Sequence, residues 1–154
     1  MEEKDFITHS SRETEDLGSK FAHNFRTGDI VVLIGALGAG KTTFVQGVAK
    51  AFNIKSRIIS PTFILVRKHR VNLKSPAFAE ASAGTQNLKT LYHIDLYRLE
   101  NSEEIKNLGL EEIFEDTDGI FFIEWGEKHE NLKTSWEINF EILGRDRRRI
   151  TLNH

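Results

Sequence analysis

The chain has 154 residues, of which 39% are apolar, 10% aromatic and 29% charged, as is typical of one ordinary globular domain. It contains no cysteine, which excludes disulfide bonds, thiol catalysis and cysteine-ligated zinc. The 21 basic and 23 acidic side chains give a net charge of −2, so the protein as a whole does not attract nucleic acid. Any nucleic-acid contact has to be local or made through a partner. No stretch approaches the ~20 apolar residues that cross a bilayer, so we expect no membrane association.

In chain order, the first predicted elements are a short edge strand at residues 6–8 and a helix. Ser10 is a favourable N-cap, and Glu13 three residues later completes a capping box. Apolar residues then recur with helical spacing from 17 to 25. The helix ends before the apolar run 30–34, which predicts a buried strand.

A glycine-rich loop follows this strand. Residues 35–42, Gly-Ala-Leu-Gly-Ala-Gly-Lys-Thr, match the phosphate-binding P-loop pattern G-x-x-x-x-G-K-[ST]. A predicted strand leads into the loop and a helical pattern over 42–52 leads out of it, which is the context that this pattern requires. The alternative is a glycine-rich turn with an exposed lysine, but it leaves the spacing unexplained.

The loop residues suit a nucleotide and its metal ion. Lys41 is expected to reach the outer phosphates, the Thr42 hydroxyl to bind Mg²⁺, and Thr43 to add a hydroxyl or backbone contact. Three further residues are expected to turn backbone N–H groups toward phosphate oxygens: Gly38, Ala39 and Gly40. Because such a site uses ATP, we expect a cytoplasmic protein.

Strands and helices alternate along the rest of the chain. The predicted elements are strand pieces at 58–59 and 63–66, buried strands at 91–95 and 120–124, a helix over 102–114 capped by Ser102, and a closing hairpin of 136–143 and 148–152. This alternation predicts an α/β fold of the P-loop NTPase type, with a mostly parallel central sheet, antiparallel edge strands and helices on both faces. Ligands of such sheets bind beyond the carboxyl ends of the strands.

Residues 75–90 break this pattern, because they are rich in small residues and carry only two charges, Glu80 and Lys89. We interpret them as a mobile surface insertion within a single domain that spans residues 1–154. A short helix over 77–83 is an alternative for part of this segment.

Two carboxylates end buried strands, Asp95 and Glu124. A carboxylate after an apolar run is costly unless it is paired or faces a charged ligand, and Mg²⁺ beside Thr42 would satisfy either one. The alternative for each is an N-cap or a salt-bridge partner. Thr62, which follows Pro61, either meets a γ-phosphate as a switch threonine or belongs to a strand entry that the proline marks.

Several other polar residues have more than one possible role. His93 shares a strand face with Asp95, so we interpret it as a structural histidine that orients or pairs with Asp95. Trp125 packs either in the core or rim, or near the nucleotide or a partner. The closing hairpin carries an arginine cluster that is either solvated or a docking patch for RNA or an acidic protein surface: Arg145, Arg147, Arg148 and Arg149.

Four motifs occur in a characteristic order: Gly-x-Leu-Gly-Ala-Gly-Lys-Thr-Thr-Phe at 35–44, Ser-Pro-Thr-Phe at 60–63, His-x-Asp-Leu-Tyr-Arg at 93–98 and Glu-Trp-Gly-Glu at 124–127. Leu-Gly-Leu-Glu-Glu at 108–112 precedes the last of them. Together they resemble the TsaE-type ATPases of bacterial tRNA threonylcarbamoyladenosine biosynthesis. The resemblance covers residues 10–150 without the 75–90 segment.

The resemblance implies a small ATPase that helps to attach a threonylcarbamoyl group to adenosine 37 of tRNAs that read codons beginning with A. It implies ATP and Mg²⁺ as cofactors. It also implies a partner, the threonylcarbamoyl transferase heterodimer of the TsaB-TsaD type, which ATP binding and hydrolysis reset between turnovers. Contact with tRNA is expected to be indirect or local.

The family's functional residues carry over by motif. Lys41 and Thr42 are implied to hold phosphate and Mg²⁺, and Glu124 is the acidic metal ligand. Asp95 is implied to act with Lys41 in catalysis, by polarising or positioning the attacking water. Two positions in the terminal segments match places where the family approaches the nucleotide: Ser11 and Gly144.

Two departures and two rival functions stay open. Ala36 stands where the family usually has an acidic or polar residue, and the 75–90 segment could alter partner docking. One rival is a P-loop small-molecule or nucleoside kinase, although no arginine-bearing lid is evident. The other is a nucleotide-dependent binding module with negligible turnover. A GTPase is disfavoured, because no Asn-Lys-x-Asp motif occurs.

Overall fold

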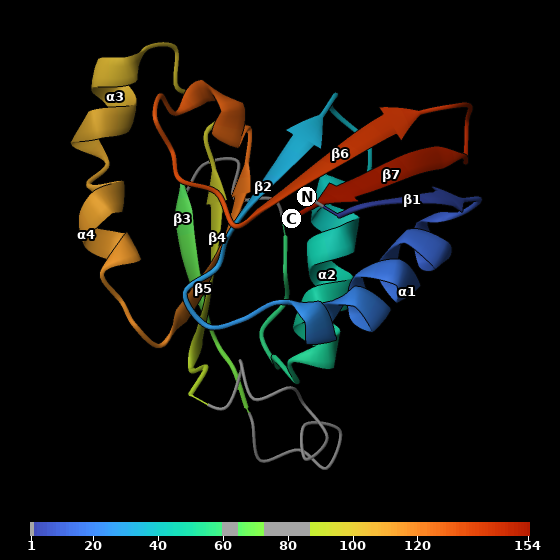
Figure 1. The fold of residues 1–154 in the computed structure, drawn as a ribbon, viewed down its shortest axis with the longest axis horizontal. Coiled ribbons are helices and arrows are strands. Elements are labelled where there is room, and N and C mark those ends of the chain that lie inside the picture. The colour runs from blue at the N-terminus through green and yellow to red at the C-terminus, as the bar shows by residue number, and fades with distance from the viewer. Residues whose placement is uncertain (1, 60–64, 73–86) are drawn as a thin grey trace.

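The computed structural model describes residues 2–59, 65–72 and 87–154. Within these residues the strands form one seven-stranded sheet with helices on both faces (Figure 1). The strands are β1 (Glu3–Thr8), β2 (Ile30–Gly35), β3 (Val66–Arg70), β4 (Thr90–Asp95), β5 (Gly119–Glu124), β6 (Trp136–Ile142) and β7 (Arg148–Asn153). The helices are α1 (Ser11–Phe21), α2 (Lys41–Ala51), α3 (Ser102–Asn107) and α4 (Leu110–Phe114), with short 3₁₀ helices η1 (Ala22–Asn24) and η4 (Gly126–Lys128). None of the described helices has the length and apolar character needed to cross a bilayer.

The strand order is β1-β7-β6-β2-β5-β4-β3. The four central strands β6, β2, β5 and β4 are parallel to one another. Both edges are antiparallel, with β7 and β1 on one side and β3 on the other. This confirms the predicted α/β fold with a parallel centre, antiparallel edge strands and a closing hairpin.

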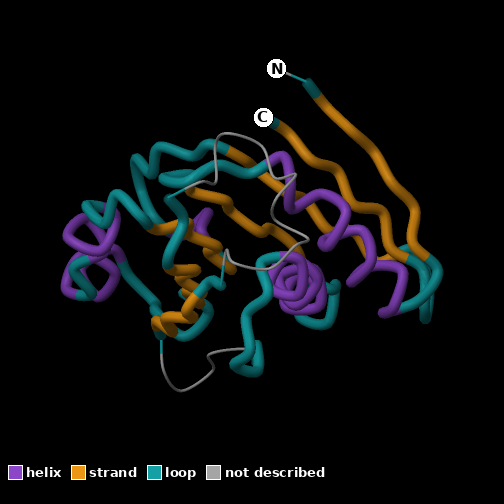
Figure 2. Tube along the Cα trace, turned by 90° about the horizontal axis from the view of Figure 1, so that it is seen from below, coloured by secondary structure: helices purple, strands orange, loops and turns teal. Residues whose placement is uncertain are grey.

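Each face of the sheet has its own core (Figure 2). Helices α1 and α2 cover one face, where the ring of Phe25 contacts Phe122 and Trp136 edge to face at 5.3 and 5.6 Å. Helices α3 and α4 cover the other face, where Phe121 stacks on Tyr92 at 4.9 Å. Because side chains of a strand alternate between faces, the wholly buried strand β5 supplies both cores.

The start of α1 follows the predicted capping pattern with one difference. The Glu13 N–H donates to the Ser10 hydroxyl at 3.1 Å, so Ser10 is the N-cap. The Glu13 carboxylate, however, accepts from the N–H of His9 at 2.6 Å rather than from that of Ser10. The carboxylate of Glu13 therefore binds the backbone of the residue before the N-cap, whereas a standard capping box binds the N-cap itself.

Three predicted boundaries were wrong. Residues 58–59 form no strand; the Ile58 carbonyl accepts instead from the Gln46 side chain at 2.9 Å. The predicted helix over 102–114 is two helices, because Gly109 takes a left-handed conformation with φ +69 between them. Its cap is Asn101, whose side chain accepts from the Glu104 N–H at 2.9 Å.

The segment around β3 was only partly anticipated. The strand begins at Val66, the end of the predicted piece 63–66, and continues to Arg70. At the other end of the 75–90 segment, Leu88 is buried and Thr90 already belongs to β4, so the predicted insertion extends too far. Residues 60–64 and 73–86 lie outside the described residues, and the rest of the insertion stays a prediction.

Helices α1 and α2 cross with glycine on both sides of the contact. A Cβ added at Gly47 would lie 1.9 Å from the Glu15 carbonyl oxygen, and one at Gly18 would lie 2.2 Å from the Phe44 carbonyl oxygen. Neither position therefore leaves room for a side chain, and the two backbones approach directly. This close crossing holds the start of α1 beside the glycine-rich loop that precedes α2.

We expect Gly47→Ala to destabilise the protein, although alanine is favoured over glycine in a helix by about 1 kcal/mol. The added methyl group has to push the helices apart, and such overpacking costs about 1–3 kcal/mol. Urea unfolding should show a lower midpoint. The exposed control Lys20→Ala on α1 should stay within about 0.5 kcal/mol of the parent. Equal or greater stability of Gly47→Ala would show that the crossing is not tight.

Candidate functional site

A cavity of about 370 Å³ opens at the carboxyl ends of the central parallel strands. Its floor is the loop between β2 and α2, and one side is formed by the ends of β4 and β5. The start of α1 and the turn between β6 and β7 complete the wall. This is the edge of a parallel sheet where ligands are expected.

The loop takes the shape that its glycines permit. Gly38 and Gly40 have φ of +76 and +105, in the left-handed region that other residues rarely adopt. Gly40 is also the N-cap of α2 and offers no side chain, so the first N–H groups of this 11-residue helix have no side-chain cap. The free N–H groups and the helix dipole both favour an anion in the cavity.

Lys41 is folded against the loop. Its side chain is buried, and its Nζ donates to the carbonyl oxygens of Gly35 and Ala36. The same Nζ lies 4.6 Å from the centre of the Trp125 ring. Burial lowers the pKa of Lys41, while the nearby charge of Glu124 acts in the opposite direction. An anion in the cavity could replace the two carbonyl contacts at little cost, since Lys41 is already desolvated.

Thr42 and Glu124 come from elements 82 residues apart and are joined directly. The Thr42 hydroxyl donates to Glu124 Oε1 at 2.6 Å, and His93 Nε2 lies 3.2 Å from the same oxygen. Burial by itself raises the pKa of Glu124, but the His93 and Thr42 hydrogen bonds and the Lys41 charge outweigh it, and the net shift is downward. Glu124 is therefore ionised at neutral pH although it is buried.

The partner of His93 differs from the predicted one. The structure joins this fully buried histidine to Glu124 on the neighbouring strand, whereas the sequence pattern had named Asp95 on the same strand. His93 is thus structural, as predicted, but it orients the other carboxylate. Finding this contact requires the register between β4 and β5, which no local pattern contains.

Asp95 lies beside Glu124, because the two residues are register partners at the ends of β4 and β5. Its Oδ1 accepts from the Tyr97 N–H at 2.9 Å, and the side chain is buried in the cavity wall. Both strand-end carboxylates therefore line the same cavity as the glycine-rich loop, and their predicted roles toward Mg²⁺ and water stay predictions. Their chemical roles are not fixed by position alone.

The oxygen atoms of Thr42, Glu124 and Asp95 are ligands that a hard cation such as Mg²⁺ prefers. Among the described residues, however, no group of three or more histidine, aspartate or glutamate side chains is arranged to hold a metal ion by itself. A cation here would need further oxygens from a ligand in the cavity. That fits Mg²⁺ delivered with phosphates better than a permanent protein-bound metal.

Most other predicted site residues also lie in or beside this cavity. Gly38, Ala39, Gly40, Thr43 and Ser11 line it. Among the described residues, Gly144 does not line the cavity, whereas its neighbour Arg145 does. Thr62 falls outside the described residues, so its role as a switch threonine stays a prediction.

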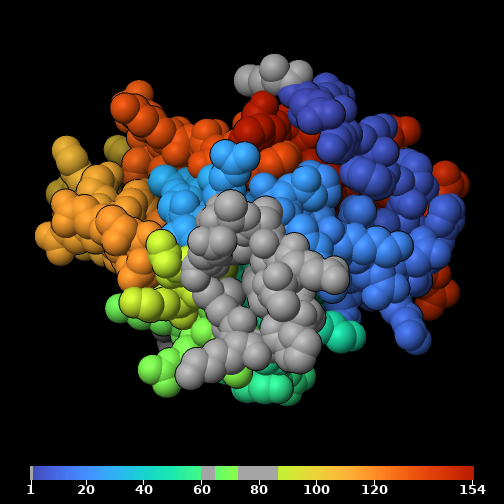
Figure 3. Space-filling view, turned by 60° about the horizontal axis from the view of Figure 1, so that its bottom comes forward, coloured from blue at the N-terminus to red at the C-terminus, as the bar shows by residue number. Residues whose placement is uncertain are grey.

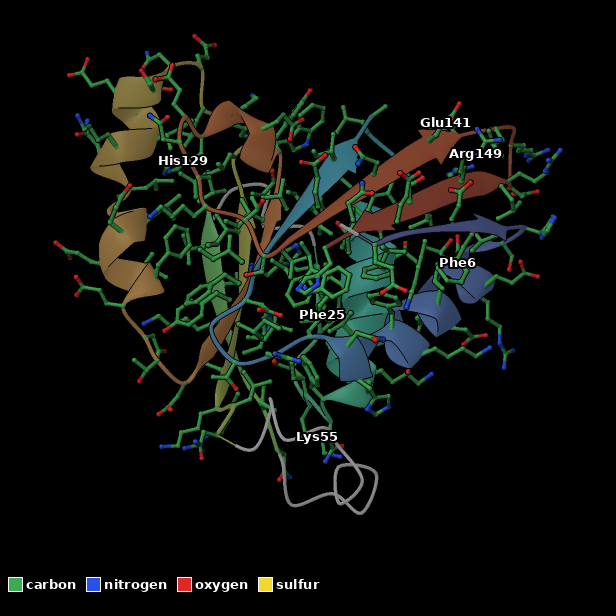
Figure 4. All side chains as sticks on the ribbon, viewed as in Figure 1. Phe6, Phe25, Lys55, His129, Glu141 and Arg149 are labelled. Carbon is green, nitrogen blue, oxygen red and sulfur yellow. The ribbon has the colours of Figure 1, made fainter. Side chains whose placement is uncertain are left out.

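The arginines of the cluster take different positions, and the docking alternative stays a prediction. Arg145 and Arg148 line the cavity. Arg149 faces Glu141 across the hairpin, with 2.9 Å between Nη1 and Oε2, and also approaches Asp5 at 3.7 Å (Figure 4). The basic hairpin therefore contributes partly to the site and partly to the outer strands.

Arg148 is a site residue that the sequence pattern did not single out. Its Nη1 donates to the carbonyl oxygens of Gly144 and Arg147, both at 2.9 Å, and to that of Arg145 at 3.3 Å. Its Nη2 donates to the Gly38 carbonyl oxygen at 3.2 Å. One guanidinium group thus holds the turn after β6 together and ties it to the glycine-rich loop. The signal in the sequence was only one arginine among four.

Comparison with known proteins agrees with this geometry. The family "Threonylcarbamoyl adenosine biosynthesis protein TsaE" matches residues 8–150. The chain belongs to the TsaE family. It is 38% identical over 143 residues to the TsaE protein of Rickettsia typhi, covering 91% of this chain and 88% of that protein. It is 34% identical over 148 residues to the TsaE protein of Treponema pallidum, covering 95% and 97% of the two chains.

Among solved structures, the crystal structure of Bacillus subtilis YdiB superposes with a TM-score of 0.69 and 26% identity. The match covers 98% of this chain and 84% of the other. The predicted family and the predicted P-loop NTPase-like fold are both confirmed. Family membership places the chain in tRNA threonylcarbamoyladenosine biosynthesis.

We expect Arg148→Met to loosen both loops that the guanidinium group connects. The substitution keeps a long side chain but removes all four hydrogen bonds, and a net loss of about 1–2 kcal/mol corresponds to roughly tenfold more local opening. Hydrogen–deuterium exchange should become faster over residues 36–40 and 143–147. Arg147→Met, an exposed neighbour, is the matched control and should leave both segments unchanged. Unchanged exchange in Arg148→Met would show that the hydrogen bonds of Arg148 do not stabilise either loop.

Proposed function

We propose that this TsaE protein binds ATP with Mg²⁺ in the cavity and hydrolyses it. In this proposal, the protein binds a threonylcarbamoyl transferase heterodimer of the TsaB-TsaD type. Its ATP binding and hydrolysis reset that complex between turnovers. The observation that supports it most is the contact of Thr42 with Glu124, since a P-loop threonine held by a strand-end carboxylate is the arrangement that positions Mg²⁺ beside phosphates.

The chain's own residues divide the work of binding. The N–H groups at the start of α2 and the glycine loop would surround the phosphates, and Lys41 would move from the Gly35 and Ala36 carbonyls to the outer phosphates. Thr42 and Glu124 would hold Mg²⁺, with His93 fixing the Glu124 carboxylate. Mg²⁺ held there would supply neutralisation of the phosphate charge.

Asp95 is the residue we propose to act on the attacking water. It lies next to Glu124 in the cavity wall, and the N–H of Tyr97 fixes its orientation through Oδ1. A water molecule that donates a hydrogen bond to this carboxylate would be oriented toward the outermost phosphate. Asp95 is thereby assigned to hydrolysis rather than to nucleotide binding.

This chain offers the proposed partner exposed apolar side chains at the mouth of the cavity. Leu37 in the glycine-rich loop is 63% exposed and Tyr97 is 40% exposed, and both line the cavity mouth. Exposed apolar side chains at a ligand site favour docking of a second protein. A partner that covers the mouth would exclude water from the phosphates and accelerate a slow reaction.

The division of roles predicts two kinds of variant. Lys41→Ala should abolish nucleotide binding, because it removes the cation expected at the outer phosphates. Asp95→Ala should bind within about threefold of the parent but lose about 100-fold or more in hydrolysis, a magnitude typical of a lost general base or positioning group. Affinity for a fluorescent ATP analogue and phosphate release should be measured for both, with Asp118→Ala as a control at the opposite end of the sheet.

Equal loss of binding in Lys41→Ala and Asp95→Ala would contradict the assigned roles. Transfer of the γ-phosphate to a small acceptor rather than to water would favour a kinase. Tight binding of ATP without hydrolysis, even with the transferase heterodimer added, would favour a nucleotide-dependent binding module.

The cellular role predicts a change in tRNA. Depletion of the protein in its host should lower threonylcarbamoyladenosine in tRNA hydrolysates, measured by mass spectrometry of nucleosides. Expression of the parent chain should restore the modification, and Lys41→Ala should not. Restoration by Lys41→Ala would separate the modification from nucleotide binding and overturn the proposal.

A further inference from the structure

A second charged feature lies away from the cavity. One hydrogen bond, between the Ser56 hydroxyl and His69 Nδ1 at 2.7 Å, joins two short basic segments, Lys55-Ser56-Arg57 and Lys68-His69-Arg70. The two segments carry four exposed cations, which we call the basic edge: Lys55, Arg57, Lys68 and Arg70. Both segments lie along the lower border of the face in Figure 3, in shades of green, and Lys55 is labelled at the base of Figure 4.

The described acidic residues do not form direct ion pairs with the basic edge. No described carboxylate forms an ion pair with any of the four, whereas nearby Lys89 pairs with Asp118 at 3.2 Å. The Asp116 carboxylate accepts a hydrogen bond from the Tyr92 hydroxyl, and the charge of Lys68 helps to lower its pKa, so Asp116 partly balances Lys68. Four cations without an ion pair to a described carboxylate still give this edge a local positive field, although the net charge of the protein is −2.

His69, between Lys68 and Arg70, connects the two segments and does not add a fifth charge. His69 is buried, and burial, together with the charges of His93 and Arg67, lowers its pKa. It is therefore neutral at pH 7, and its contact with Ser56 serves to hold the two segments together. The positive field comes from the four exposed side chains.

The shape of this region suits an extended polyanion. Strand β3 ends the sheet order, and within the described residues it pairs only with β4. Lys68 and Arg70 lie on one face of that strand, about 6.6 Å apart along it. They flank a hollow of about 510 Å³, which His69 and Lys89 also line. A row of cations can follow a chain of phosphates.

The basic edge is remote from the cavity. Arg70 is paired in register with Thr90 at the amino end of β4, whereas Asp95 ends the same strand at the cavity. The two positions are five residue steps apart along β4, which corresponds to a distance of about 17 Å along the strand. A ligand on the basic edge therefore leaves the nucleotide site open, and variants of the edge need not affect it.

We propose that the basic edge binds the phosphate backbone of RNA, and specifically of tRNA. Phosphate contact by exposed lysine and arginine positions RNA without reading its sequence, which suits a protein that acts on many tRNAs. RNA is favoured over an acidic protein surface because family membership places the chain in a pathway whose substrate is tRNA. The inference goes beyond ATP hydrolysis and depends only on that membership.

The experiment measures binding of fluorescein-labelled tRNA to the full chain by anisotropy, over 50–200 mM KCl. The parent protein should bind with a clear salt dependence. Arg57→Gln/Arg70→Gln removes one cation from each segment, so it should weaken binding at least tenfold. It should also reduce the slope of log affinity against log salt by about 1.4–1.8, the value for two phosphate contacts. Lys20→Gln/Arg147→Gln makes the same change in net charge at other exposed positions and should bind like the parent.

Binding of a fluorescent ATP analogue serves as the folding control, and it should be unchanged in both double variants. Absence of tRNA binding by the parent at 50 mM KCl would overturn the inference, as would equal weakening by the two double variants. Normal tRNA binding by Arg57→Gln/Arg70→Gln, combined with lost binding to the transferase heterodimer, would assign the edge to an acidic protein instead. Failure of ATP hydrolysis would leave the tRNA result intact, so the two proposals fail separately.

Discussion

The hydrogen bond from Thr42 to Glu124 is the interaction on which the functional end of the molecule depends. It connects the first turn of α2 to the last residue of β5, and so fixes the glycine-rich loop against the carboxylates. The bond can form only because β2 and β5 are parallel neighbours and end at the same edge. A buried carboxylate would otherwise be costly, and the three groups around it, His93, Thr42 and Lys41, keep it charged.

Segments near both ends of the chain form part of the cavity wall. Strands β1 and β7 pair along their whole length, so α1 after β1 and the turn before β7 are carried to one side of the loop. Ser11 and Arg148 therefore both line the cavity although they are far apart in the sequence. The tight glycine crossing of α1 with α2 and the hydrogen bond of Arg148 to Gly38 hold this wall against the glycine-rich loop.

Local patterns predicted the parts of the site that local physics determines. The glycine-rich loop, the buried strands and the carboxylates at their ends each appear within a few residues of sequence, and parallel strands bring such ends together. The partner of His93 and the contact of Arg148 depend on strand register and hairpin docking, which span the whole chain. Most of strand β3 was not predicted, for a different reason: beyond Val66 its sequence, Arg-Lys-His-Arg, lacks the apolar alternation of a half-buried strand, and the strand lies at the edge of the described sheet.

The sheet separates two chemically different surfaces. At the carboxyl ends of its strands, helix N–H groups without a side-chain cap and two carboxylates form the site that we propose for a phosphate ligand with a cation. At the amino end of β4, an edge strand presents cations without carboxylate partners among the described residues. Since β4 carries Asp95 at one end and pairs with Arg70 at the other, a single rigid strand connects the two surfaces. A polyanion on the edge and a nucleotide in the cavity can then be held at once, at a separation that the strand length sets.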